Sequence, residues 1–381
     1  MRRPTRCVER NKSIITGKEN LEHLHTFKDF PVFMGCVDTP QDEDMVADME
    51  WNICRDTGVI QLGKLLPLEV LYLDQHNDGV GRVWQEHYTA FAKFLAKFRP
   101  KRILEIGGAH DYIANNLWNI DPDVVWTTVE PNPQHIDNQK IKVIRGWFDD
   151  AFKLEMPVDT VVHSHVLEHT YYPLEFIGHI GRFLNKGDKH IFTLPNMLPM
   201  LEQKFTNCLN FEHTVLLTED IVDFFLKKTG FKILEKEYYG DPHSIFYATE
   251  KTDMPDNVPT ISNKYEEYKK VFMDYISYHI AMVDNLNKAI AKSKEPVYLF
   301  GAHIFSQTLI QFGLKTDNIV CVLDNSSLKN KKRLYGTSLI VESPQILRGR
   351  GKVNVILKAG IYNEEIKKDI LENINDEVVF L

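Results

Sequence analysis

The sequence lacks the features that would place the chain in a membrane or direct it out of the cell. No apolar run in its 381 residues approaches the roughly 20 residues needed to cross a bilayer. The first segment, Met1-Arg-Arg-Pro-Thr-Arg6, has no apolar core of the kind found in a signal peptide. The five cysteines are odd in number and far apart, which favours reduced thiols over a disulfide framework. We therefore expect a cytoplasmic protein with no membrane partner.

An excess of positive charge is also missing. The chain has 45 Lys and Arg residues against 53 Asp and Glu, which gives a net charge of −8. Its basic residues are scattered, so it has no electrostatic footprint for nucleic acid. The hydrophobic fraction of 43% is ordinary for a globular protein, and the length is sufficient for two or three domains. These properties predict a multidomain globular protein that does not bind nucleic acid.

The most informative stretch is Arg102-Ile-Leu-Glu-Ile-Gly-Gly108, an apolar strand that ends in a glycine turn. A helix is expected over 112–118, and a second apolar strand then ends on Glu130. This order is the layout of an α/β nucleotide-binding crevice. The glycines let the backbone approach a ligand, and the terminal carboxylate can accept two hydrogen bonds from ribose hydroxyls.

Two ligands fit this layout, a dinucleotide and S-adenosylmethionine. The dinucleotide pattern needs G-x-G-x-x-G, but the run here is Gly107-Gly108-Ala109-His110-Asp111 and lacks the later glycines. Asp111 would repel a diphosphate, whereas a sulfonium cofactor carries no phosphate. The pattern therefore favours S-adenosylmethionine over a dinucleotide, with an ordinary structural glycine turn as the alternative. The expected cofactor contacts are Glu105, Gly107, Gly108, Glu130 and Pro131.

Strands and helices alternate from residue 102 to residue 250, which predicts an α/β class with a mostly parallel sheet. An N-cap at Thr218 predicts a helix that ends at Gly230, and two consecutive strands after it predict an antiparallel closing pair. Apolar runs after residue 263 predict a long helix and a further α/β unit. We therefore predict three domains: a small N-terminal zinc-module-like domain (1–75), a methyltransferase-type domain (76–254), and a linker helix with a C-terminal Rossmann-like domain (255–381).

Three histidines follow the fourth predicted strand of the middle domain. His165 and His169 are four residues apart and could share a helical face, and with His163 they could form a metal site. No carboxylate or thiol completes such a site convincingly. The alternative is that the histidines lie at the crevice rim, where one of them could act as a base or contact a substrate.

A second candidate lies in the loop before the Thr218 helix. There Glu212 could orient His213 and activate it as a general base. The alternative is a loop whose Glu caps the next helix and whose His is merely exposed.

The N-terminal segment contains candidates for a structural zinc site. A zinc site of this type would show two C-x-x-C knuckles. Here Arg10 and Thr57 stand where the second cysteine of each knuckle would be, three residues after Cys7 and Cys54. Buried, inert thiols are therefore the favoured interpretation, and no metal is expected. The weak candidates for ligands are Cys7, Cys36 and Cys54, with His23 and His25 nearby.

Taken together, these segments resemble the three-domain, S-adenosylmethionine-dependent sugar C-methyltransferases that act on nucleotide-linked deoxysugars. In that family a small zinc module precedes a methyltransferase domain and a C-terminal Rossmann-like domain. The resemblance covers nearly the whole chain and is most specific in the C-terminal domain. The segments that carry it are Glu105-Ile-Gly107, Glu130-Pro131, His165-Val-Leu-Glu-His169, Leu194-Pro-Asn196, Asn210-Phe-Glu-His213, Phe300-Gly-Ala302, and 324–340.

The resemblance implies a role for each of several residues. It implies His213 as the base, Glu212 as its orienting residue and His169 as an alternative base. Asn210 stands where the family has a tyrosine near the reacting carbon, which leaves the acceptor and the choice of C- or O-methylation open. The further implied contacts are Phe148 and His165 for the cofactor, and His76, Asn196, Asn210 and His243 for the substrate.

The sequence therefore predicts an S-adenosylmethionine-dependent methyltransferase acting on a sugar, in particular a nucleotide-linked one, with C-methylation of a keto-deoxysugar favoured. The alternatives are a sugar O-methyltransferase and a methyltransferase-like scaffold that binds without catalysis. A nicotinamide-dependent enzyme is the least favoured interpretation.

Overall fold

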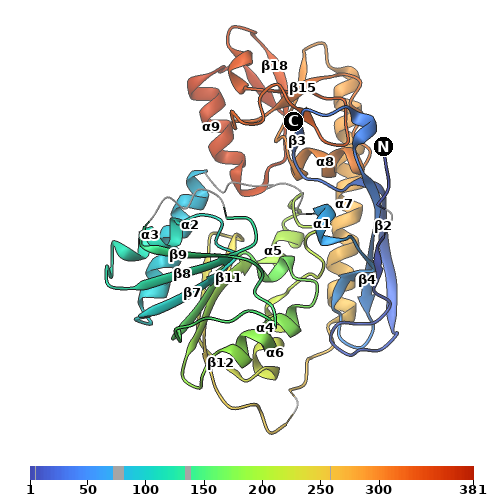
Figure 1. The fold of residues 1–381 in the computed structure, drawn as a ribbon. Coiled ribbons are helices and arrows are strands. Elements are labelled where there is room, and N and C mark those ends of the chain that lie inside the picture. Colours follow the sequence, from blue (N-terminus) through green and yellow to red (C-terminus); the bar gives the residue numbers. More distant parts are fainter. Residues whose placement is uncertain (5, 72–80, 134–138, 258) are drawn as a thin grey trace. The chain divides into compact units, whose positions relative to one another are not determined.

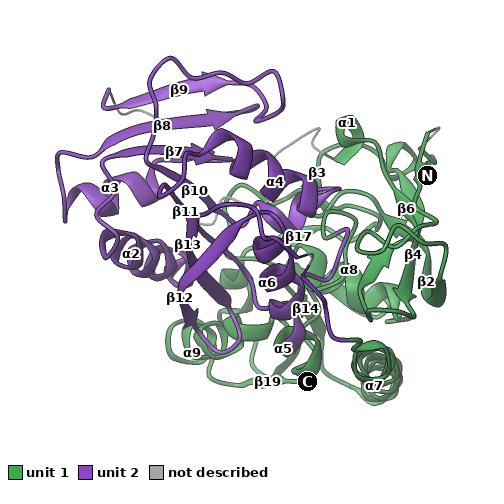
Figure 2. Cartoon of the chain, turned by 90° about the horizontal axis from the view of Figure 1, so that it is seen from below, with its two compact units in different colours: residues 1–77, 199–213, 263–381 green, residues 78–198, 214–262 purple. Residues whose placement is uncertain are grey.

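The computed structural model describes residues 1–4, 6–71, 81–133, 139–257 and 259–381 (Figure 1). The chain forms two compact units that alternate along the sequence (Figure 2). Unit 1 comprises 1–77, 199–213 and 263–381, and unit 2 comprises 78–198 and 214–262. The N-terminal and C-terminal segments thus share one unit, and the division into three consecutive domains stays a prediction.

Unit 2 is built on a seven-stranded sheet with the order β12-β13-β11-β10-β7-β8-β9. Neighbours from β11 to β9 run parallel, and β13 runs antiparallel to β11 and β12. The predicted parallel sheet with a late antiparallel pair is confirmed. The strands are β7 (Arg102–Ile106), β8 (Val125–Glu130), β9 (Ile141–Arg145), β10 (Thr160–Ser164), β11 (Lys189–Pro195), β12 (Phe231–Tyr239) and β13 (Ser244–Lys251).

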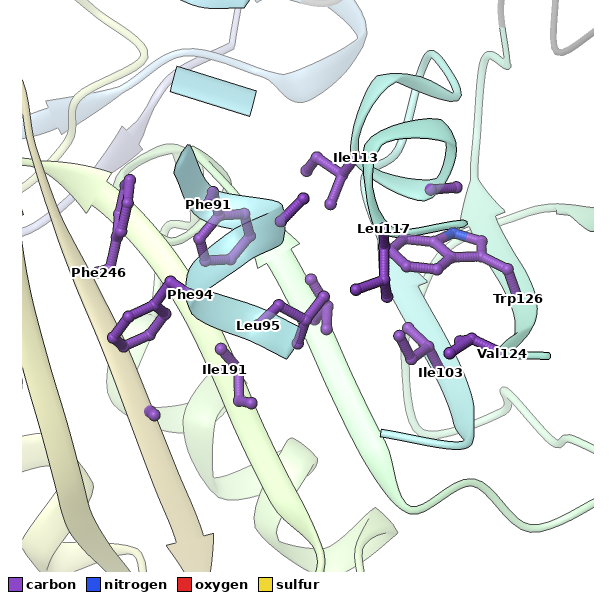
Figure 3. Close-up of a cluster of buried hydrophobic side chains, with 14 of the residues drawn as sticks. Phe91, Phe94, Leu95, Ile103, Ile113, Leu117, Val124, Trp126, Ile191 and Phe246 are labelled. Atoms are coloured by element: carbon purple, nitrogen blue, oxygen red, sulfur yellow. The ribbon is translucent and has the colours of Figure 1, made fainter. Parts of the chain in front are cut away.

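Helices cover both faces of this sheet, which is why its central strands are apolar on both sides. On one face, Phe91, Phe94 and Leu95 of α2 pack with Ile191 and Phe246 of the strands (Figure 3). On the other face, Tyr247 donates a hydrogen bond to Asp223 of α6. The helices of unit 2 are α2 (Arg82–Ala96), α3 (Tyr112–Trp118), α4 (Pro173–Phe183) and α6 (Glu219–Lys228).

The structure corrects two local predictions in unit 2. The segment after β10 is not the start of a helix: His165 has a φ of 53°, Leu167–His169 is a single 3-10 turn (η2), and α4 begins only at Pro173. His165 and His169 therefore do not share a helical face. Thr218 is the N-cap of α6 as predicted, but its hydroxyl donates to Asp220 and does not cap a backbone amide.

The C-terminal part of unit 1 is a parallel five-stranded sheet with the order β17-β15-β14-β18-β19. The predicted Rossmann-like architecture is thereby confirmed. The long helix α7 packs Val283, Leu286 and Ile290 into its core. The elements are α7 (Tyr265–Lys292), β14 (Val297–Phe300), α8 (Ile304–Gln311), β15 (Ile319–Leu323), β16 (Arg333–Leu334), β17 (Val341–Glu342), η3 (Pro344–Leu347), β18 (Val353–Leu357), η4 (Gly360–Tyr362), α9 (Asn363–Asn373) and β19 (Val378–Phe380).

The N-terminal part of unit 1 is a small β module. Its main sheet has the antiparallel order β2-β4-β5, and β3 pairs with β16 of the C-terminal part. The elements are β1 (Val8–Glu9), β2 (Leu21–Pro31), β3 (Cys36–Val37), η1 (Gln41–Glu43), β4 (Val46–Cys54), β5 (Ile60–Leu62), β6 (Lys64–Leu65) and α1 (Leu68–Leu71), and α5 (Met197–Glu202) begins the segment that returns to this unit. Among the helices of the described residues, none is both long and apolar enough to span a bilayer.

Candidate active site

The carboxyl edge of the unit 2 sheet gathers most of the predicted site residues. The Gly107-Gly108 turn follows β7, Glu130 ends β8, His165 follows β10 and Asn196 follows β11. Because β13 is antiparallel, its first residue pairs with the last residue of β11, so His243 reaches the same edge. The amide of Asn196 donates to the His243 carbonyl at 3.3 Å. Ligands of open α/β sheets bind at this edge.

Both glycines of the first turn are required by close contacts. Gly107 has a φ of 76°, and a Cβ there would lie 2.6 Å from Val166 Cγ2. A Cβ on Gly108 would lie 2.3 Å from Glu105 Oε2. Side chains at these positions would therefore distort the turn, which explains why glycine stands at both.

The Glu105 carboxylate supports this turn from inside the domain. Its side chain is buried, and Oε2 accepts hydrogen bonds from Trp126 Nε1 at 2.9 Å and Thr128 Oγ1 at 3.1 Å. Burial raises the pKa of Glu105 to about 7. These contacts make Glu105 a residue that positions the turn, and its direct contact with a cofactor stays a prediction.

Glu130 has the position and chemistry expected of a ribose ligand. Its Oε1 accepts a hydrogen bond from the Asn132 amide at 2.8 Å, and Pro131 holds the chain between them. Burial raises the pKa of Glu130, while the hydrogen bond from the Asn132 backbone amide acts to lower it. A carboxylate has more lone pairs than this one bond uses, so Glu130 can also accept from sugar hydroxyls. The glycine turn and this carboxylate together fit S-adenosylmethionine.

Phe148, which follows β9, packs against aromatic side chains of α4. Its ring centroid is 4.6 Å from that of His179 and 5.4 Å from that of Phe183. The ring is half-buried after β9. A cofactor contact of Phe148 stays a prediction, and His76 lies outside the described residues.

His165 and His243 come together with a histidine that the sequence analysis did not identify, His87 of α2. One ring nitrogen of each lies within 4.8 Å of the others. Burial lowers the pKa of His243 to about 3 and lowers that of His87 strongly, so both rings are uncharged at neutral pH. The available signal for His87 was a histidine in the apolar stripe that continues with Phe91 and Leu95.

His163 does not reach the crevice rim. It is fully buried on the opposite face of the sheet, where its Nε2 lies 3.0 Å from Nε2 of His190 and its ring stacks on Phe192. His163 is in neither group of potential metal ligands among the described residues, so the suggested site of His163, His165 and His169 is wrong. The physical reason is that β10 ends at Ser164 and the backbone turns at His165, whose φ is 53°. His169 lies beyond the strand, with its Nε2 4.0 Å from Glu168 Oε1.

The loop that contains the predicted base belongs to unit 1. Asn210 Oδ1 accepts hydrogen bonds from the amides of Glu212 and His213, at 2.9 and 2.8 Å. His213 Nδ1 lies 3.1 Å from the Cys208 carbonyl. The same Nδ1 lies 3.2 Å from Asn210 Nδ2, so both of these contacts hold the ring through Nδ1. Asn210 thus shapes the loop, while its substrate contact and the orienting role of Glu212 stay predictions.

The three N-terminal cysteines lie in different surroundings. Cys7 is exposed, and Cys36 Sγ lies 3.4 Å from the Ala302 carbonyl. Cys54 is buried; burial acts to raise its pKa, but hydrogen bonds from Ser13 and Thr57 outweigh that effect and lower it. Hydroxyl groups thus surround the sulfur of Cys54. Among the described residues, no group of three potential metal ligands includes a cysteine.

In the C-terminal sheet, the turn after β14 corresponds to the glycine turn after β7, and the side chain of Asp324 binds its backbone. Gly301 has a φ of 101° after β14, and the next amide, of Ala302, donates to Asp324 Oδ2 at 2.9 Å. Asp324 also pairs with Lys329 at 3.2 Å. A carboxylate of the protein thus binds the backbone amide that follows this glycine.

Comparisons with known proteins agree with this description of unit 2. Residues 80–236 match a family model described as a methyltransferase domain. No curated protein matches the chain. Similar solved structures include an O-methyltransferase family protein from Burkholderia thailandensis (14% identity, 45% of this chain and 57% of that chain, TM-score 0.39). Another is N,N-8-amino-8-demethyl-D-riboflavin dimethyltransferase from Streptomyces davawensis (18%, 44% and 55%, TM-score 0.35).

A third similar structure is a putative S-adenosylmethionine-dependent methyltransferase from Listeria monocytogenes (12% identity, 44% of this chain and 98% of that chain, TM-score 0.36). The chain spans little more than half the length of the first two proteins. The matched segment contains the glycine turn, Glu130 and His165, so the family match and the site coincide. Residues 80–236 thus match a methyltransferase domain model, and the unit that contains them has the mostly parallel α/β sheet that the sequence predicted.

Proposed function

We propose that this protein is an S-adenosylmethionine-dependent methyltransferase whose acceptor is a sugar, in particular a nucleotide-linked keto-deoxysugar that is methylated on carbon, and that His213 is the general base. The observation that supports the base assignment is that the contacts of His213 with Cys208 and Asn210 hold its ring through Nδ1. Support for a sugar acceptor comes from the resemblance of the whole chain to the sugar C-methyltransferases.

The chain's own residues provide the cofactor site. The backbone at Gly107 and Gly108 gives the methionine end of the cofactor an open approach, and Glu130 accepts from its ribose hydroxyls. The sulfonium group supplies an electrophilic methyl carbon. The protein's contribution at this step is chiefly to hold the nucleophile in line with that carbon, which is an orientation effect.

The proposed base acts on the acceptor. For a keto sugar, His213 Nε2 takes the proton from the carbon next to the carbonyl, and the resulting enolate is the nucleophile. For O-methylation, the same nitrogen takes a hydroxyl proton. Asn210 holds the loop in shape through the amides of Glu212 and His213. His169 is the alternative base in this scheme.

The test uses a panel of nucleoside-diphosphate sugars with and without a keto group, with methyl-labelled S-adenosylmethionine and mass spectrometry of the product. In D2O without the methyl donor, a keto sugar that is the true acceptor should gain deuterium next to its carbonyl. His213→Asn should reduce both deuterium gain and methyl transfer by about 10²–10⁴-fold, with unchanged affinity for S-adenosylhomocysteine. His23→Asn, on an exposed histidine of unit 1, is the matched control.

Each result points to one interpretation. Methylation of hydroxyl sugars alone would favour the O-methyltransferase alternative. Loss of turnover in His169→Asn but not in His213→Asn would move the base role to His169. If no sugar is methylated although S-adenosylhomocysteine binds, the sugar acceptor is wrong and the methyltransferase class stands.

A further inference from the structure

Three histidines that are distant in sequence meet at the carboxyl edge of the unit 2 sheet. His87 comes from α2, His165 from the turn after β10, and His243 from the residue before β13. One nitrogen of each imidazole lies within 4.8 Å of the other two. The Trp84 ring lies beside all three, with centroid distances of 5.4, 4.9 and 5.0 Å.

Each imidazole has a nitrogen that faces a protein oxygen. His87 Nε2 lies 3.4 Å from Thr193 Oγ1, and His243 Nδ1 lies 2.6 Å from Ser244 Oγ. His165 Nδ1 lies 3.1 Å from the carboxylate of Glu168, whose side chain is 1% exposed. Histidines that bind metals commonly use one nitrogen for the metal and donate from the other to such an oxygen.

The opposite nitrogen of His87 has no such oxygen. Nδ1 of His87 is buried and lacks a hydrogen-bond partner among the described residues, and the side chain as a whole is 0% exposed. Nearly all buried polar atoms in proteins have a hydrogen-bond partner or a ligand, so one is expected for His87 Nδ1 as well. Its surroundings are aromatic, with Tyr239 and Phe246 at centroid distances of 5.3 Å each.

We propose that His87, His165 and His243 bind a divalent transition-metal ion such as Zn²⁺ or Co²⁺. Three imidazoles are a known ligand set for zinc, and imidazole suits these ions better than it suits Mg²⁺ or Ca²⁺. The ligand atoms are His87 Nδ1, His165 Nε2 and His243 Nε2. A fourth position, open to the sheet edge, would take a water or an oxygen atom of the acceptor.

Binding requires small local adjustments. In a tetrahedral site the ligand nitrogens are about 3.4 Å apart, so the rings must approach one another by roughly 1 Å. His165 Nε2 also lies 3.0 Å from Ser244 Oγ, and the metal would replace that contact. The site lies wholly within unit 2, so the inference does not depend on the proposed sugar acceptor or on His213.

The test is a Co²⁺ titration of tag-free enzyme after treatment with a chelator. One equivalent of Co²⁺ should produce the visible absorption bands of a tetrahedral site, and Zn²⁺ should abolish them by competition. His87→Gln and His243→Gln should each weaken Co²⁺ binding by more than about 100-fold, and Glu168→Gln by about 10–100-fold. His179→Gln, on a half-buried histidine of the same unit outside the cluster, should leave binding unchanged.

Folding of each variant is checked by thermal unfolding and by S-adenosylhomocysteine affinity. If a variant fails to fold, the wild-type enzyme still gives an answer, since Zn²⁺ should raise its unfolding temperature in a saturable way. Absence of the cobalt bands and of this Zn²⁺ effect in the wild type would overturn the site. Equal Co²⁺ affinity in the wild type and in both folded His→Gln variants would also overturn it, because the ion would then bind elsewhere.

Discussion

At the scale of single residues, the glycine turn depends on one buried carboxylate. Glu105 lies beneath Gly108, and its hydrogen bonds to Trp126 and Thr128 hold it in place. Glycine spacing alone predicted the turn. It did not predict that a carboxylate whose pKa is raised to about 7 would support it.

Gly108→Ala should destabilise unit 2 by about 1–3 kcal/mol and weaken S-adenosylhomocysteine binding. The added Cβ would meet Glu105 Oε2 at 2.3 Å and Thr128 Cγ2 at 2.9 Å, and overpacking of this kind is costly. Calorimetry of unfolding and of ligand binding measures both effects. Gly178→Ala in α4 is the control, because its Cβ would make only ordinary contacts, the nearest at 3.6 Å. Equal behaviour of the two variants would show that the turn tolerates a side chain.

Glu105→Gln should remove a pH dependence of stability. Because the folded-state pKa of Glu105 is raised from 4.5 to about 7, the folded state binds the proton more tightly than the unfolded state. This group therefore lowers stability as pH rises from about 4.5 to about 7, by at most about 3 kcal/mol. Denaturant unfolding at several pH values should show this fall in the wild type and a flatter profile in the variant. Identical pH profiles would contradict a raised pKa.

At the scale of elements, the N-terminal β module is joined to the C-terminal part of unit 1 by a buried ion pair. Asp44 follows η1 and is 0% exposed, and its two oxygens pair with Arg333 of β16 at 2.6 and 2.7 Å. The Gly336 amide also donates to Asp44 at 2.7 Å. The pairing of β3 with β16 adds backbone hydrogen bonds beside it.

Asp44→Asn should destabilise unit 1 by about 3–5 kcal/mol, because the Arg333 guanidinium would stay buried without its counter-charge. Denaturant unfolding measures this change. Asp274→Asn is the control, since its pair with Lys270 on α7 is exposed to solvent, which screens it, and the substitution should leave stability nearly unchanged. A cost below 1 kcal/mol for Asp44→Asn would show that the pair is not needed for this connection.

At the scale of the whole molecule, the two units are built from alternating stretches of chain. The chain leaves unit 2 after 198, contributes 199–213 to unit 1 and returns at 214. This excursion contains Asn210, Glu212 and His213. The segment is tied to unit 1 by contacts of its backbone, since Tyr275 donates to the Phe205 carbonyl and Thr308 to the Thr206 carbonyl.

S-adenosylhomocysteine should stabilise unit 2 selectively. At a concentration of about 100 times its Kd, a ligand that binds only the folded state adds about 2.7 kcal/mol, or roughly 5–10 °C for a domain of this size. Differential scanning calorimetry should show that one of two transitions moves. Hydrogen exchange should then show increased protection in 78–198 and 214–262. An equal increase in protection from exchange across both units would mean that the two units unfold together.

The sequence by itself determined what depends on local pattern. Apolar runs and helical spacing predicted β7 to β11, α6 and α7. Each of these elements forms hydrogen bonds within itself or with an adjacent strand, and its buried residues recur with a regular period. The glycine turn and the acid at the end of β8 were predictable for the same reason: each is a local requirement of the backbone. Cofactor class followed from these short-range signals.

Only the tertiary structure decided which distant side chains meet. His87, His165 and His243 come from a helix, the turn after a parallel strand and the turn before an antiparallel strand, and nothing in their spacing reveals that they share one edge of a sheet. His163 showed the converse: it lies two residues from His165, but β10 ends between them and the positive φ of His165 turns the chain away from the path of the strand. Such contacts between distant side chains depend on the strand order, on the helix packing and on which unit the segment 199–213 joins. These are properties of long-range packing, which a local pattern of residues does not specify.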